Sequence, residues 1–421
     1  MGFLFVNLAP TAPTPASWPA WWRVAGELGY FAALAVVIGG TLTYLAVVRP
    51  VLRATDRMSE DTDALVMRNH SARLLTWPGL ALVVAAYFQL ATRVARATPP
   101  TPFGQALAPS RMWQFLTQAP KAGSWASTGT LFLVQNLLFV VAAALLVATR
   151  YAIGRLDTLV TVAVIAAVAA SAVASVPTNL STQTTDSALG VLMSQVHIVA
   201  GCAYLGGLAG LASLSRARHA LGAHAGLFWA RIWQRFSVLA LTAVGGIIIS
   251  GSWLTWKHVG GLSEFATTTY GRFLLAKLVL VLALISAGAY NQFLLTPRIA
   301  RAHAAGDIGT GFALTLRHFP AVVTIEAALG AGVLLIVPFL SGSARAQAGD
   351  GPTPTIDGII LFLGILLVAG LAATFYASHR VSLLLTYRAA AEGHSLHRAR
   401  EPLPYTMNRA DAPATPHHPW R

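Results

Sequence analysis

Three consecutive apolar stretches decide the fold of this chain: LGVLMSQVHIVAGCAYLGGLAGLASL (189–214), RFSVLALTAVGGIIISGSWLTWKH (235–258) and YGRFLLAKLVLVLALISAGAYNQFLLTP (270–297). Each is long enough to cross a bilayer as a helix, because about 20 residues rising ~1.5 Å each span a hydrocarbon core of ~30 Å. They also contain polar side chains such as His197 and Lys277. Since an ionisable side chain inside a membrane is costly, such residues are candidates for a functional site.

The whole chain has this character. Its 421 residues are 55% hydrophobic and only 10% charged, whereas an ordinary soluble domain is about 25% charged. The apolar runs are continuous rather than alternating, which favours helices over a β-barrel. We therefore predict an all-α fold, a polytopic transmembrane helix bundle of about nine spans. The predicted spans are 27–47, 74–92, 130–149, 156–176, 189–213, 236–256, 271–293, 319–340 and 357–377.

The orientation of the spans follows from where lysine and arginine fall, because loops rich in these residues stay in the cytoplasm. Alternate connections and the tail from Arg380 hold 20 of the 29 basic residues. With nine spans, this places the N-terminus outside and the C-terminus in the cytoplasm. The connection 93–129 is an exception, because it is assigned to the outside yet holds Arg93, Arg96, Arg111 and Lys121 with no acidic residue. The net charge of +14 is explained by this topology rather than by binding to nucleic acid.

A family resemblance is carried by five motifs in order: His197, then 203–207 (AYLGG), 235–237 (RFS), 270–277 (YGRFLLAK) and 288–291 (GAYN). Together they resemble the core of the copper-resistance D (CopD) family. The resemblance implies integral-membrane helices of the bacterial inner (plasma) membrane, associated with moving copper across it. It adds copper resistance and metal homeostasis to the expected functions.

The chain is expected to have four parts. Residues 1–26 form an extracytoplasmic N-terminal segment, and residues 27–176 form an N-terminal four-helix membrane part. Residues 177–377 form the CopD-like membrane core. Residues 378–421 form a cytoplasmic tail that we expect to be disordered, because the end of the chain is rich in proline.

Met193 and His197 are four residues apart, which puts a thioether and an imidazole on one helix face. Such ligands suit copper, whose reduced form favours Met, Cys and His. We predict His197, Met193 and His258 as ligands of a copper ion near the outer side of the membrane. The alternatives are a hydrogen bond from His197 to a neighbouring helix, packing for Met193 and an interfacial anchor for His258.

Three further polar residues, Lys277, Glu326 and Asn291, are predicted to form a relay or pathway. A fixed charge at Lys277 would repel copper unless it is paired, so a carboxylate or backbone carbonyls should lie close; alternatively, Lys277 snorkels to the interface. Glu326 is the candidate partner, although it is expected at a different depth. A carboxyl group at that depth is protonated, hydrogen-bonded to a residue such as Asn291, or part of a cation or proton path.

The leading hypothesis is an inner-membrane copper transport or delivery protein that takes copper ions from the extracytoplasmic side. Its partners would be the lipid bilayer and an extracytoplasmic copper chaperone or a copper enzyme under assembly. The sequence has no GxxxxGK[ST] phosphate-binding loop, which argues against ATP-driven pumping by this chain. We do not expect an enzyme, because no nucleophile, zinc or nucleotide signature stands out.

Two alternatives come from other classes. A membrane electron carrier with b-type haem needs pairs of histidines at one depth, and the candidates are His197 with His258 and His318 with His379. A structural or assembly subunit of a membrane complex would use the polar residues only to fix helix packing. A Soret band in the purified protein would favour the first alternative over copper transport.

Overall fold

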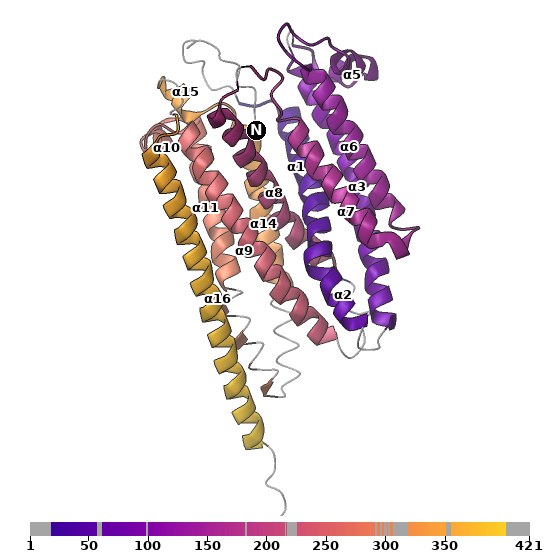
Figure 1. Ribbon diagram of the computed structural model, residues 1–421, viewed down its shortest axis with the longest axis vertical. Coiled ribbons are helices and arrows are strands. Elements are labelled where there is room, and N and C mark those ends of the chain that lie inside the picture. Colours follow the sequence, from indigo (N-terminus) through magenta and orange to yellow (C-terminus); the bar gives the residue numbers. More distant parts are fainter. Residues whose placement is uncertain are drawn as a thin grey trace, which may run out of the picture. The chain divides into compact units, whose positions relative to one another are not determined.

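The computed structural model is predominantly helical over its described residues (Figure 1). The described residues are 18–56, 61–97, 100–181, 183–214, 216, 225–290, 293–294, 297–298, 301, 304–305, 319–350 and 355–400. No strand occurs among them. The predicted all-α polytopic bundle is therefore confirmed.

The long helices match the predicted spans. Their bounds are α1 (Trp21–Thr43), α3 (Asp61–Ala95), α6 (Thr128–Ala148), α7 (Leu156–Val173), α8 (Thr185–Leu214), α9 (Ala225–His258), α11 (Thr269–Tyr290), α14 (Phe319–Ile336) and α16 (Gly358–Arg400). By length and composition, eight helices among the described residues can cross a membrane. The remaining predicted span, 319–340, coincides with α14. Its apolar helix, measured over described residues only, runs over Ile325–Phe339 and is shorter than the other eight.

Short helices connect the long ones. They are α2 (Arg49–Asp56), α4 (Phe103–Ala106), α5 (Pro109–Leu116), α10 (Glu264–Thr267) and α15 (Ala344–Ala348). Because α1 and α6 run in opposite directions to α3 and α7, the connections gather at two ends of the bundle. We call these the α5 end, which also holds α10 and α15, and the α2 end (Figure 1).

Two helices extend beyond the apolar runs that predicted them. Helix α3 begins at Asp61 rather than at 74, and α16 continues to Arg400 rather than ending at 377. The prediction of a disordered tail is therefore wrong for 378–400, because hydropathy detects only the apolar part of a helix. Good helix formers such as Leu, Ala and Arg continue α16 past its apolar part. The rest of the predicted tail, 401–421, lies outside the described residues.

A widened π-helical turn, Tyr44–Val48, joins α1 to α2. Pro50 follows it, and a proline ring within a helix clashes with the carbonyl four residues earlier and lacks an N–H donor, which accounts for the widened turn. The turn brings Tyr44 and Arg49 close to Asp157, which lies in the first turn of α7. Tyr44 Oη donates a hydrogen bond to the Asp157 carboxylate at 2.8 Å, and Arg49 Nε forms an ion pair with it at 2.8 Å. These contacts fix the α2 end of the N-terminal part.

Helices α1 and α8 touch backbone to backbone. A Cβ atom at Gly39 would collide with the carbonyl oxygen of Cys202 and the backbone of Gly206, and a Cβ at Gly206 would collide with the carbonyl group of Ala35. Small residues at this seam let the two helix backbones approach closely. The seam also joins the N-terminal part to the membrane core.

By their contacts, the described residues up to Gly288 and those in Phe319–Tyr376 form one compact unit. The hydrophobic core of this unit includes fully buried Leu34, Ile38, Phe139 and Leu146. A second unit is drawn from Ala289–His318 and Ala377–Arg421. Within it, Arg301 Nη2 and Glu392 Oε2 form an ion pair of 2.6 Å.

Candidate functional site

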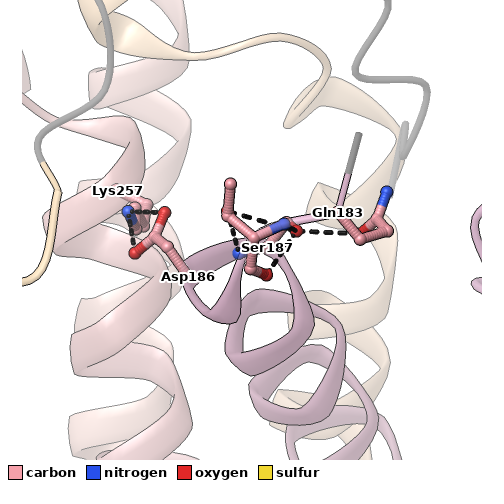
Figure 2. A network of polar contacts seen from close by, with 5 residues as sticks. Gln183, Asp186, Ser187 and Lys257 are labelled. Carbon is pink, nitrogen blue, oxygen red and sulfur yellow. Dashed lines mark hydrogen bonds and ion pairs between the residues drawn. The ribbon is translucent and has the colours of Figure 1, made fainter. Parts of the chain in front are cut away.

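The membrane core has an ion pair where α8 begins and α9 ends. Lys257 Nζ, in the last turn of α9, donates to both carboxylate oxygens of Asp186 at 2.7 and 2.6 Å (Figure 2). The ammonium group also lies over the rings of Trp256 and Trp253, at 4.6 and 5.5 Å from their centroids. This cluster joins α8 to α9 at the α5 end and neutralises the lysine there.

His258 follows Lys257 and is bound to its surroundings. Its Nδ1 donates to the Leu254 carbonyl oxygen at 2.7 Å. Its ring lies nearly parallel to the Tyr270 ring, with an interplanar angle of 10° and 5.9 Å between centroids. His258 therefore links the end of α9 to the start of α11.

His197 lies deeper, opposite Ser250 of α9, and its ring is hydrogen-bonded to that serine. His197 Nδ1 is 3.0 Å from Ser250 Oγ, and Ser250 Oγ is 2.5 Å from the Gly246 carbonyl oxygen. When Ser250 donates its hydrogen to Gly246, its oxygen accepts from Nδ1–H, and the Nε2 of this tautomer has a lone pair. An imidazole nitrogen with a lone pair can bind a metal ion.

The structure does not bring His258 to His197. Ser250 and Gly251 contact the His197 ring, whereas His258 is eight residues further along α9, which corresponds to about 12 Å. The predicted three-residue copper site is therefore not assembled, since only Met193 shares the helix face of His197. Among the described residues, no group of three or more His, Cys, Asp and Glu side chains is placed to hold a metal ion.

The same separation excludes His197 and His258 as the first pair of haem ligands, because both axial ligands must lie at one depth. The second pair cannot be placed. His318 lies outside the described residues, and nothing is described of the His379 side chain.

Lys277 of α11 is buried at the level of His197. It is 9% exposed and lies within electrostatic range of His197. Across the part of the chain that the structure describes, its ammonium group has no hydrogen-bond or ion-pair partner. The lysine cation would repel a metal ion bound at His197, and any proposed function must account for this repulsion.

Glu326 of α14 lies deeper than Lys277, as predicted from the sequence. Gly332 packs on Leu280, with 3.2 Å between a Cβ built on the glycine and the nearest side-chain atom. Lys277 is three residues from Leu280 toward the α5 end, and Glu326 is six residues from Gly332 toward the α2 end. At 1.5 Å per residue the two backbones differ in depth by about 13 Å, so they do not form a direct ion pair.

Glu326 is 3% exposed and interacts electrostatically with Tyr204 of α8. The two belong to neighbouring helices, because Leu205 packs on Gly330 of α14. Asn291, the third predicted relay residue, lies outside the described residues. The membrane core thus has polar side chains at three depths, which we call the polar series: His258 at the α5 end, His197 with Ser250 and Lys277 below it, and Glu326 with Tyr204 below these.

Residues 230–340 match the family model described as Copper resistance protein D. This part of the chain is similar to the CopD family. The match covers about a quarter of the sequence and includes His258, Lys277 and Glu326, whereas Met193 and His197 lie before its first residue. The description of the family model relates this segment to copper resistance. Comparisons with curated proteins and with solved structures gave no match.

Proposed function

We propose that this protein moves copper ions through the bacterial inner membrane, taking them from the extracytoplasmic side. Copper is the cargo rather than a resident cofactor. The α5 end would face outward and the α2 end the cytoplasm, as the excess of arginine in the α2-end connections favours. A copper chaperone, or a copper enzyme that receives the ion, would be the partner at the α5 end.

The observation that carries the proposal is the hydrogen bond between His197 and Ser250. In the tautomer whose Nδ1–H donates to Ser250, Nε2 offers a lone pair inside an apolar bundle. Met193 lies one turn away on the same face, toward the α5 end, and adds a thioether. An imidazole and a thioether suit reduced copper.

The small number of ligands favours transit over storage. A site with one imidazole and one thioether holds an ion less firmly than a closed site with three or four ligands. The repulsion from Lys277 weakens the hold further, which helps release toward Glu326. A carboxylate at that depth can receive a cation that leaves His197.

Copper uptake into proteoliposomes tests the proposal. We expect His197→Ala to lower the initial rate at least about tenfold, since a metal ligand is removed. His70→Ala, in α3 of the N-terminal part, serves as the matched control and should keep the wild-type rate. Copper content after dialysis and the visible spectrum of each purified protein should be recorded alongside.

Equal uptake by wild type and His197→Ala would overturn the proposal. A Soret band would instead revive the electron-carrier hypothesis. If His197→Ala and His70→Ala lose thermal stability together and neither changes uptake per folded molecule, the polar residues serve packing alone.

A further inference from the structure

A second polar cluster lies at the α5 end of the N-terminal part, apart from the polar series. We call it the arginine cluster: Arg23 and Glu27 of α1, and Arg93 and Arg96 at the end of α3. Glu27 Oε1 accepts a hydrogen bond from Arg23 Nε at 3.0 Å and lies 3.7 Å from Arg96 Nη1. Two guanidinium groups therefore share one carboxylate and the third, that of Arg93, has none, which leaves an excess of positive charge.

The guanidinium group of Arg93 contacts an aromatic ring rather than a carboxylate. It lies over the Phe132 ring of α6, 5.4 Å from the centroid. Within the described residues it makes no hydrogen bond or ion pair. Its five N–H donors are therefore available to a ligand.

The surroundings of Arg96 confirm that positive charge dominates the cluster. Burial lowers the pKa of the Arg96 guanidinium, Arg23 and Arg93 each lower it further, and the opposing effect of Glu27 is the smallest of these contributions. Repulsion between neighbouring arginines thus exceeds the attraction that Glu27 supplies. An anion in this place would relieve that repulsion.

The cluster lies among aromatic residues typical of a membrane interface. Trp22, next to Arg23, stacks on Phe103 of α4 with 4.8 Å between ring centroids. Trp21 beside it is 77% exposed. Tryptophan is enriched at the depth of lipid headgroups, which is where phosphate groups are concentrated.

We propose that Arg93 and Arg96, held in place by Phe132 and Glu27, bind a phosphate group at the α5 end. The planar guanidinium fork matches phosphate oxygens in a bidentate arrangement. The phosphate comes either from the headgroup of an acidic phospholipid or from a soluble phosphate anion. This site also accounts for two of the four basic residues, Arg93 and Arg96, that break the charge rule in the connection 93–129.

Titration of the detergent-purified full-length chain tests the site and separates the two sources. The probes are short-chain phosphatidylglycerol, short-chain phosphatidylcholine and inorganic phosphate, with binding followed by native mass spectrometry and calorimetry. The variants are Arg93→Gln and Arg96→Gln. Arg111→Gln is the matched control, because Arg111 is an exposed arginine of the same connection and lies on α5 outside the cluster.

We expect wild type and Arg111→Gln to bind phosphatidylglycerol alike and each cluster variant to bind it about five- to tenfold more weakly. Binding of phosphatidylglycerol without inorganic phosphate assigns the site to lipid, and the reverse pattern assigns it to a soluble anion. The Arg96 side chain is 37% exposed and lies beyond the last residue of α3, so its variant should fold even if Arg93→Gln does not. Unchanged binding in Arg96→Gln, or an equal loss in Arg111→Gln, would overturn the proposal.

Discussion

The N-terminal part and the membrane core are both helical and apolar, yet they bury their helices to different extents. In the N-terminal part, 61% of the most apolar stretch of α1 is buried within the protein, and 44% in α3 and α7. In the membrane core the corresponding shares are 22% for α8 and 17% for α9 and α11. The less buried helices are the ones that carry Lys277 and the His197 site.

This difference distinguishes a closely packed region from one whose apolar surface is more exposed. The N-terminal part is stabilised by close contact between helices, so its side chains are constrained by shape. The membrane core leaves most of its apolar surface to lipid and directs a few polar side chains inward. Substitutions in the two regions should therefore differ in kind: loss of folding in the first and altered ion handling in the second.

The largest effect is expected at the seam where the two regions meet. Gly206→Val places a branched side chain against the backbone of α1, which cannot move aside as a side chain could. We expect a loss of more than about 3 kcal/mol and little folded protein in detergent by size-exclusion chromatography. The control is Gly201→Val in the same helix, where a Cβ meets nothing within 4 Å. If both variants fold equally well, the seam does not hold the two regions together.

A second loss of stability is expected from cavities. Phe139 of the N-terminal part is 1% exposed, and Phe139→Ala should cost about 3–5 kcal/mol by thermal unfolding in detergent. Leu282 of α11 is 63% exposed within the protein, so Leu282→Ala should cost less than about 0.5 kcal/mol. Equal losses in the two variants would mean that the membrane core is packed against a partner rather than against lipid.

No loss of stability is expected at Lys277. Lys277→Met removes a buried charge that has no partner among the described residues, so stability should stay the same or rise by up to about 2 kcal/mol. Copper affinity measured by competition with a chelator should increase on the order of tenfold, because the repulsion at His197 disappears. Lys277→Arg keeps the charge and should resemble wild type. A loss of copper binding in Lys277→Met would show that the lysine supports the ion rather than repelling it.

Much of the fold could be predicted from the sequence, because a membrane span depends only on consecutive apolar residues. Each apolar run of about 20 residues became a helix. Helix ends were less predictable. Helix α3 begins at Asp61 because a charged segment continues the helix outside the apolar run, and hydropathy carries no signal for that.

The candidate site was only partly predictable, because partners far apart in the sequence decide it. His197 was identified as a polar residue in a span, but its partner Ser250 was missed, although a hydroxyl group in IIISGSW is a detectable signal. Asp186 and Lys257 are 71 residues apart, so their ion pair could not be read from spacing. His258 and His197 were both assigned to the outer side, and only the contacts along α9 separate their depths.

The backbone contact between α1 and α8 has a consequence for how the protein folds during its synthesis. Gly39 is synthesised more than 160 residues before Gly206, so at 5–20 residues per second α1 waits roughly 8–30 s for its neighbour. During that time the glycine surface of α1 lies against lipid or against the insertion machinery. A chain cut between the two regions would leave that surface uncovered permanently, so the N-terminal helices should need the core to be translated before they reach their final arrangement.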